Sequence, residues 1–318
     1  MEVRNSSRPN LIACLVATAV AVIVLSASRA AAQSPSSPPA LSAEPSLFAP
    51  VAEYFADWMP RATRIQSEQP HWITPLVTVT PRLEQEYRYD QLWQAQAHGA
   101  ALDNFGASKG LELIPWYNVE VILGVPGWIA HNGSIPHPKA KKNGKRPVAP
   151  PIDGWADETF LVKYRILSAN EDSGNYLLTA FMGFSAPTGA DGNSARHAVF
   201  TPAIAFGKGW GAFDFQSTLG VAIPNGGMER LSMPLSYNTA FQYHVLTYFW
   251  PELEVNYTWF TRGENAGKNQ VFLTPGLVVG RIPVRERLGL TFGAGYQVAV
   301  THHPAYNHAV VFSGRIPF

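Results

Sequence analysis

The sequence predicts an all-β protein: a transmembrane antiparallel up-and-down β-barrel of about 12 strands, preceded by a cleaved signal peptide and a short N-terminal amphipathic helix. Three observations lead to this prediction. The C-terminus alternates between apolar and polar residues, similar alternation recurs along most of the chain, and the connecting segments divide into long and short ones. Strict alternation indicates a strand with one apolar face. Because a bilayer offers no partners for backbone polar groups, strands cross it only as a closed barrel.

The final segment, residues 306–318, alternates most clearly. One parity is mostly apolar with aromatic ends and includes Phe312, Ile316 and Phe318, whereas the other is small or polar and includes Arg315. A strand of this kind that closes on Phe is typical of bacterial outer-membrane barrels. We therefore expect Phe312, Ile316 and Phe318 to form the strand that the barrel-assembly machinery recognises.

Alternating segments precede this one almost throughout the chain. The apolar parity is rich in aromatic residues, and the opposite parity is rich in Gly, Thr, Gln and charge, as expected for lipid outside and a wet lumen inside. Strands are predicted near 77–89, 109–114, 117–125, 157–168, 175–186, 197–206, 210–223, 234–248, 251–262, 269–281, 286–301 and 306–318.

The connecting segments give an independent test of this assignment. If Phe318 is periplasmic, the extracellular connections are 302–305, 263–268, 224–233, 187–196, 126–156 and 90–108. The periplasmic ones are then 282–285, Trp250 alone, 207–209, 169–174 and 115–116. Long loops thus fall on one side and tight turns on the other, and an even strand count leaves both barrel ends in the periplasm, as in known barrels.

Aromatic residues gather at both sets of connections, which predicts two belts at the depths of the membrane interfaces. Those near the short connections are Trp116, Phe206, Trp210, Tyr248, Phe249, Trp250 and Phe318. Those near the long connections are Trp128, Trp155, Trp259 and Tyr306.

The N-terminal part predicts export. Arg4 and Arg8 precede an apolar run over 11–25 and an Ala-rich end, the three parts of a secretory signal cleaved near Ala32. The domain organisation is therefore a signal peptide over 1–32, a disordered Ser- and Pro-rich linker over 33–45, an amphipathic helical segment over 46–74 that acts as a plug or a periplasmic cap, and the barrel over 75–318. The predicted localisation is the outer membrane of a Gram-negative-type cell.

The composition excludes other classes. Cys14, in the predicted signal, is the sole cysteine, so the mature chain has no disulfide or thiol chemistry. Without residues 1–32 the chain is close to neutral, which argues against nucleic acid as a partner.

Inward parity places a set of polar and charged side chains in the lumen. They could line a water-filled path and set its field, or pair across the barrel as filling. Their mixed sign argues against strong anion or cation selectivity. The pore-lining candidates are Lys163, Arg165, Asp214, Gln216, Gln242, His244, Glu252, Glu254, Asn256, Gln270, Gln297 and Arg315.

Catalysis is not expected. His197, His302, His303 and Asp191 lie at predicted extracellular edges, but no spacing among them is diagnostic of a nucleophile and base or of a metal site. No cofactor and no metal are predicted.

The predicted loop between Trp128 and Trp155 is basic. It is either a solvated surface loop or a contact for lipopolysaccharide phosphates, which attract clustered cations. Its basic residues are Lys139, Lys141, Lys142, Lys145 and Arg146.

Several short segments resemble the family of outer-membrane proteins named for the meta-pathway of phenol degradation. They are Trp155-Ala-Asp157, Lys163-Tyr-Arg165, Ala186-Pro-Thr-Gly189, Gly110-Leu-Glu-Leu-Ile-Pro-Trp116 and Asn118-Val-Glu120. The resemblance covers roughly residues 75–318 and implies a transporter-like barrel for aromatic or other hydrophobic small molecules. The basic loop and the 46–74 segment look like additions to the family pattern, and the second could occlude the lumen.

We therefore expect a barrel for passive or substrate-selective passage of small molecules, with the bilayer, lipopolysaccharide and the assembly machinery as partners. The alternatives are a non-conducting structural barrel and an outer-membrane hydrolase.

Overall fold

The computed structural model describes residues 49–96, 100–132 and 152–318. The chain divides into two units, residues 1–53 and residues 54–318. Helix α2 (Ala49–Ala56) contains the described part of the first unit, and helix α3 (Trp58–Ser67) lies wholly in the second. Within the described ranges, no helix has the length and apolar character needed to cross a membrane. The predicted signal, linker and cleavage site lie outside the described residues.

The second unit contains a closed antiparallel barrel. Its sheet has 16 strand segments, and pairing of β16 with β1 closes it. Four passes of the chain consist of two segments each, so the wall is crossed 12 times and the predicted fold class is confirmed. The segments are β1 (Glu86–Ala95), β2 (Ala101–Gly106), β3 (Gly110–Trp116), β4 (Val119–Gly124), β5 (Trp128–Asn132), β6 (Gly154–Trp155), β7 (Glu158–Ala169), β8 (Tyr176–Ala186), β9 (Val199–Trp210), β10 (Phe213–Val221), β11 (Ile223–Pro224), β12 (Pro234–Tyr243), β13 (Phe249–Phe260), β14 (Asn269–Arg285), β15 (Leu288–Ala299) and β16 (His308–Pro317).

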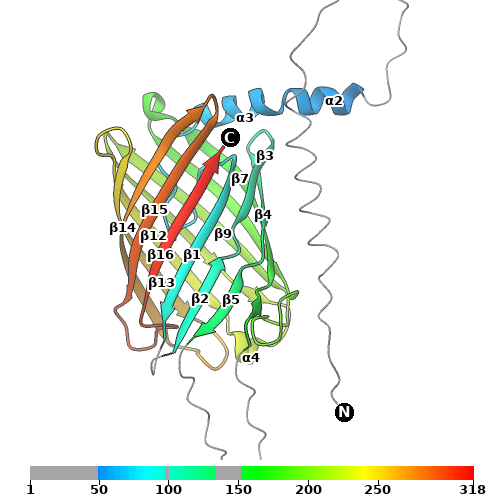
Figure 1. Ribbon diagram of the computed structural model, residues 1–318, viewed down its shortest axis with the longest axis vertical. Coiled ribbons are helices and arrows are strands. Elements are labelled where there is room, and N and C mark those ends of the chain that lie inside the picture. The colour runs from blue at the N-terminus through cyan, green and yellow to red at the C-terminus, as the bar shows by residue number, and fades with distance from the viewer. Residues whose placement is uncertain (1–48, 97–99, 133–151) are drawn as a thin grey trace, which may run out of the picture. The chain divides into compact units, whose positions relative to one another are not determined.

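The two ends of the barrel differ in the length of their connections, as predicted. At the turn end the connections are residues 117–118, 170–175, 211–212, 244–248 and 286–287. At the loop end they are residues 96–100, 133–153, 187–198, 225–233, 261–268 and 300–307. The turn end also carries the C-terminus, and α3 lies beside it (Figure 1). Two short helical pieces, η2 (Glu171–Ser173) and α4 (Met228–Leu231), lie in these connections.

Helix α3 packs on the turn end through two apolar side chains. Ala62 and Ile65 are fully buried and form a cluster with Leu83 and Ile114. Helical structure ends at Ser67, so the last residues of the predicted 46–74 helical segment are not helical.

The predicted first strand, 77–89, is wrong in its position. Residues 77–85 form no strand, and β1 begins at Glu86. Several backbone groups of 77–85, such as the Val77 and Thr78 amides and the Val79 carbonyl, bond to side chains of the wall instead of to a neighbouring strand. Pro81 has no N–H to donate to one.

Other predicted connections are also wrong. The expected turns 115–116, 207–209 and 282–285 lie within β3, β9 and β14, and the turns follow these strands. The expected loop 90–108 contains β2, which pairs with β1. The expected loop 126–156 contains β5 and β6, which pair with each other. Trp250 is not a turn, because β13 starts at Phe249 and the preceding turn is 244–248. The segments β2, β5 and β6 are short and lie beside Ala and Gly, so their alternation is too weak to indicate a strand from the sequence.

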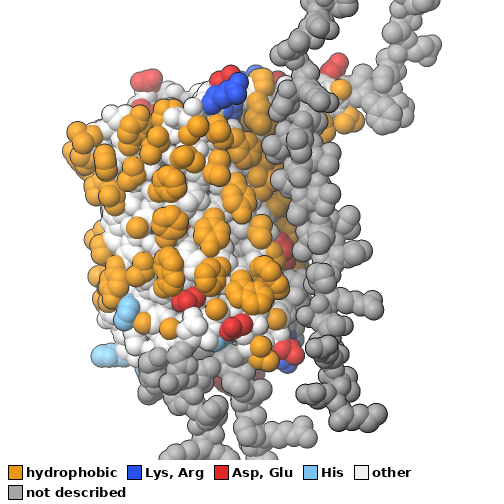
Figure 2. All heavy atoms as spheres, viewed as in Figure 1, with side chains coloured by type: hydrophobic (Ala, Val, Ile, Leu, Met, Phe, Trp, Pro, Cys, Tyr) orange, Lys and Arg blue, Asp and Glu red, His pale blue; other side chains and the backbone are white. Residues whose placement is uncertain are grey.

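The two faces of the wall have opposite character. In β16 the side chains of Val310, Phe312 and Ile316 face outward and are at least partly exposed, whereas Ser313 and Arg315 are buried inside, which confirms the predicted parity. Figure 2 shows hydrophobic side chains covering the outer surface of the strands on one side of the barrel. The barrel is therefore apolar outside and polar inside, the reverse of a soluble sandwich.

Aromatic side chains gather near both ends, with two exceptions to the predicted belts. Trp116 and Trp210 are exposed near the turn end, and Trp128 packs edge-on against Trp155 near the loop end at 5.1 Å between ring centroids. Trp250, by contrast, is 8% exposed and points inward, where it stacks on His244. Tyr306 also points inward, stacks on Phe272 and bonds to Gln297.

Candidate functional site in the barrel lumen

The lumen is occupied by the segment between α3 and β1. Residues 69–85, here called the insert, enter from the turn end, fold back and leave to start β1. The two arms contact each other: the Gln69 side chain donates to the Leu83 carbonyl at 2.8 Å and accepts from the Leu83 amide at 3.0 Å. Thr74 also donates to Glu84 across the arms at 3.0 Å.

Two carboxylates of β13 bind the amides at the tip of the insert. Glu254 accepts hydrogen bonds from Val77 and Thr78 at 2.7 and 2.6 Å, and Glu252 accepts one from Leu76 at 3.1 Å. An irregular segment inside a protein leaves backbone donors that must find partners. Here the partners are carboxyl oxygens of Glu252 and Glu254.

Side chains from the rest of the wall bind the carbonyls of the insert. These bonds come from β1, β7, β8, β10 and β16, so six carbonyls of the insert find partners without secondary structure. The pairs are Arg315 with Pro75 (2.7 Å), Arg88 with Leu76 (2.6 Å), Gln216 with Ile73 (2.9 Å), Thr218 with Val79 (2.8 Å), Thr179 with Pro81 (2.6 Å) and Lys163 with Arg82 (3.1 Å).

Buried ion pairs surround Arg82 and Glu84, which lie in the arm of the insert that leads to β1. Arg82 pairs with Glu84 at 2.8 Å, and Lys163 pairs with Glu120 at 3.0 Å. The second oxygen of Glu120 accepts the Glu84 amide at 2.6 Å, and Arg281 reaches Glu84 at 3.3 Å. Desolvating these charges is costly, and the cost is offset only where the pairs have further hydrogen bonds, as here.

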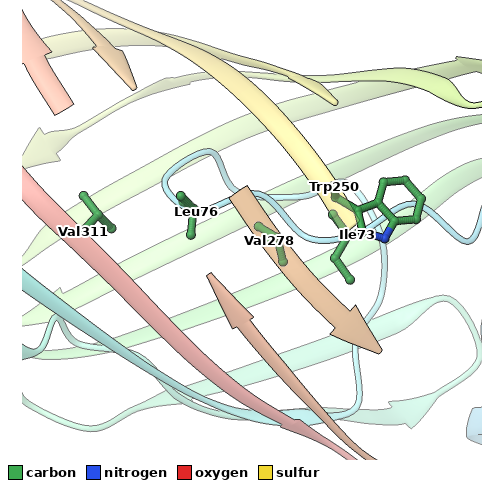
Figure 3. Close-up of a cluster of buried hydrophobic side chains, with 5 residues drawn as sticks. All are labelled: Ile73, Leu76, Trp250, Val278 and Val311. Carbon is green, nitrogen blue, oxygen red and sulfur yellow. The ribbon is translucent and has the colours of Figure 1, made fainter. Parts of the chain in front are cut away.

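The apolar tip residue Leu76 fits into a socket made of wall glycines. A Cβ added at Gly276, Gly293 or Gly295 would lie 2.6, 2.5 or 2.8 Å from the Leu76 side chain. Leu76 and Ile73 of the insert also belong to a buried cluster with Trp250, Val278 and Val311 of the wall (Figure 3). The wall is thus shaped to receive this segment.

The base of the insert is fixed at the turn end. Glu171, in the β7–β8 turn, accepts the His71 amide at 2.6 Å and contacts the His71 ring at 2.9 Å. Partial burial raises the pKa of Glu171, but the hydrogen bonds from His71 outweigh this effect and hold the pKa below its usual value. Arg165 bonds to the Ile65 carbonyl and to Glu68 just before the insert.

Most predicted pore-lining candidates face the interior. Two lie at its ends: His244 follows β12 at the turn end, and Gln270, the second residue of β14, lies at the loop end and accepts a hydrogen bond from the Ala305 amide. The buried ones are Lys163, Arg165, Asp214, Gln216, Gln242, Glu252, Glu254, Asn256, Gln297 and Arg315. Several of these contact the insert, and Gln216, Gln242 and Glu252 form a chain of hydrogen bonds at 2.8 and 2.6 Å.

Sequence reasoning missed several interior charges. Arg88 and Asp90, paired at 2.8 Å, lie in β1, whose position the sequence analysis misjudged. Glu112 and Glu120 lie in predicted strands, and the same parity rule applied there would have found them.

Two hollows adjoin this network. A cavity of about 230 Å³ lies between the tip of the insert and the loop end, bounded by β3, β4, β7, β8 and β9. A second hollow of about 370 Å³ lies at the turn end beside Arg165, Glu68 and Tyr117.

The histidines considered for catalysis are not assembled into a site. Asp191 pairs with Arg196 at 3.1 Å. Among the described residues, no hydrogen bond joins His197, His302 or His303 to a Ser or a carboxylate, and no cluster of three or more potential ligands could hold a metal.

No family model and no curated protein matches the chain. Its structure matches that of an outer membrane channel from Pseudomonas putida F1 at 14% identity and a TM-score of 0.49, covering 73% of this chain and 94% of that one. OmpF of Salmonella typhi in complex with daunomycin matches at 9% identity and a TM-score of 0.34, covering 73% and 96%. The fold itself is established by the strand pairing of this chain.

Proposed function

We propose that the chain is an outer-membrane barrel that passes small molecules, with the insert constricting its lumen. This proposal rests on the observation that the insert, and not only side chains of the wall, fills the lumen. The space is occupied by a separate segment held by hydrogen bonds to inward side chains, whereas a barrel that only stiffens a membrane can be filled by wall side chains alone.

Barrel size supports this proposal. Barrels of about 8 strands are filled by their own side chains, and those of 16–18 leave an aqueous channel. A wall crossed 12 times lies between these cases. It leaves a lumen wide enough for the two arms of the insert and for a cavity of about 230 Å³.

The orientation follows from the connections. Short turns face the periplasm and long loops face outward in barrels of this kind. The turn end, from which the insert enters, is then periplasmic, and the cavity lies on the extracellular side of the insert. We place Phe312, Ile316 and Phe318 in contact with the assembly machinery, and residues 139–146, outside the described residues, near lipopolysaccharide.

The insert can leave the lumen without breaking the wall. It contributes no strand to the sheet. Among the described residues, its hydrogen bonds to the wall each involve a side chain, except the bond from the Phe318 amide to the Gln85 carbonyl just before the start of β1. We therefore assign to it the role of a displaceable constriction, and to Lys163, Glu252 and Glu254 that of setting the field of the opened path.

Planar-bilayer conductance of the refolded mature chain tests this proposal. Glu254→Ala removes both acceptors of the Val77 and Thr78 amides. We expect larger or more frequent unitary steps than in the unchanged chain. Gln297→Ala is the control, because Gln297 bonds to Asn256 and Thr274 and not to the insert.

The competing function is a structural, non-conducting barrel. It would be supported if folded protein, with and without Glu254→Ala, gave no steps at all. Equal steps in all three proteins would instead support passage and remove the role given to the insert.

A further inference from the structure

We infer that the cavity at the tip of the insert binds a small zwitterion, a molecule that carries an ammonium and a carboxylate a few bonds apart. This inference rests on the proposed passage of small molecules and names their chemical class. Two uncommitted charges of opposite sign in one cavity carry the argument.

Glu112 supplies the negative charge. It is 4% exposed, points inward from β3 and lines the cavity. No hydrogen bond or ion pair connects its carboxylate to any residue that the structure describes. Of the other buried interior glutamates near it, Glu84 is engaged by Arg82 and Glu120 by Lys163. Glu86, the partner of Glu112 across β1 and β3, has no ion pair among the described residues, but it does not line the cavity. A desolvated carboxylate without a partner is costly, so this position favours a cationic group in the cavity.

Lys109 supplies the positive charge. It lies in the break between β2 and β3 and lines the same cavity. Within the described part of the chain it has no carboxylate within the 4.0 Å that defines an ion pair, and this includes Glu112. The two other cations of the lining are committed, Arg88 to Asp90 and Lys163 to Glu120. An anionic group therefore has one free partner here.

The remaining lining fits a short aliphatic body. Val79, Ile122 and Leu161 are apolar, and hydroxyls come from Thr80, Thr159, Ser185 and Thr201. The volume of about 230 Å³ is below the range of roughly 300–1,000 Å³ typical of drug-sized ligands. The aromatic or hydrophobic solutes implied by the family resemblance would leave both charges unpaired, whereas a zwitterion pairs both.

Titration calorimetry on the refolded full chain tests the inference with three isosteres. 4-Aminobutanoate carries both charges, butanoate only the negative one and butylamine only the positive one. We expect 4-aminobutanoate to bind at least about tenfold more tightly than either, since each of the two monovalent molecules lacks one charge-assisted hydrogen bond.

Two substitutions identify the charges. Glu112→Gln should weaken 4-aminobutanoate about tenfold and leave butanoate unchanged, and Lys109→Met should weaken butanoate and 4-aminobutanoate alike. Glu112→Asp and Lys109→Arg, which keep the charges, should retain the preference and show that loss of binding is not loss of folding. Tyr296→Phe, on the outer face of β15 and outside the cavity, should bind like the unchanged chain.

The outcomes separate this inference from the proposed function. Equal affinity for the three molecules, or no effect of Glu112→Gln on binding, overturns the zwitterion site, even if Glu254→Ala gives the larger unitary steps that the proposed function predicts. Tight, charge-dependent binding of 4-aminobutanoate to a barrel that never conducts supports the site and overturns passage.

Discussion

At the scale of single residues, small side chains decide where the insert fits. Gly276, Gly293 and Gly295 follow the inward faces of two adjacent strands, and each leaves room for Leu76. In the sequence these glycines weaken the strand signal, since Gly has no side chain to pack and is entropically costly in a strand. In the structure their lack of a Cβ is what admits the tip.

Gly293→Ala tests this socket. The added Cβ would lie 2.5 Å from the Leu76 side chain, which must shift, and we expect a loss of about 1–3 kcal/mol in the free energy of unfolding. Leu76→Ala in the same chain should recover part of this loss, a non-additivity that a double-mutant cycle measures. Denaturant unfolding of the refolded barrel in lipid vesicles gives the numbers.

Gly314→Ala is the matched control, because its added Cβ would meet nothing nearer than 3.8 Å. A loss as large as that of Gly293→Ala, or additive effects of Gly293→Ala and Leu76→Ala, would contradict the socket.

At the scale of elements, the insert shows why a periodic pattern is not sufficient for a strand. Residues 77–85 alternate well enough to predict one, yet their amides bond to Glu254 and Glu120 and their carbonyls to Thr218, Thr179 and Lys163. Alternation of apolar and polar residues indicates that the two faces of a segment differ in environment. It does not indicate whether the backbone of the segment bonds to another strand or to side chains.

The base of the insert should respond to acid. The folded-state pKa of Glu171 lies below its ordinary value of 4.5 because of the His71 hydrogen bonds. The contribution of this contact is therefore complete above pH 4.5 and is lost as the pH falls through the lower folded-state value. We expect the exchange protection of the His71 amide to fall over that range.

Glu171→Gln isolates the effect from that of other carboxylates. The variant keeps an oxygen that can accept the His71 amide but has no titratable group at position 171. The exchange protection of the His71 amide should therefore be weaker at neutral pH and nearly independent of pH in the acid range. An unchanged pH profile in Glu171→Gln would show that the base is held by other contacts.

At the scale of the whole molecule, the outer face carries the membrane assignment. Ala294 lies near the middle of β15 on the outward parity, and Val300 follows the end of that strand at the loop end; both are exposed. If lipid surrounds the barrel, Ala294→Arg should cost about 2–4 kcal/mol of unfolding free energy in vesicles, and Val300→Arg about 0–1 kcal/mol.

A barrel exposed to water would behave differently. There, both arginine substitutions would be surface changes of about 0.5 kcal/mol or less. Equal small effects of Ala294→Arg and Val300→Arg would therefore remove the membrane assignment and the proposed passage with it.

The sequence by itself determined the antiparallel barrel, the count of 12 crossings, the side on which long connections lie and which parity of β16 faces outward. These properties are local, since alternation and turn length are written in consecutive residues. Only the tertiary structure decided that residues 69–85 fill the lumen and which charges they engage. Those contacts join residues such as Thr78 and Glu254, 176 positions apart, and no local pattern encodes a partner at that distance.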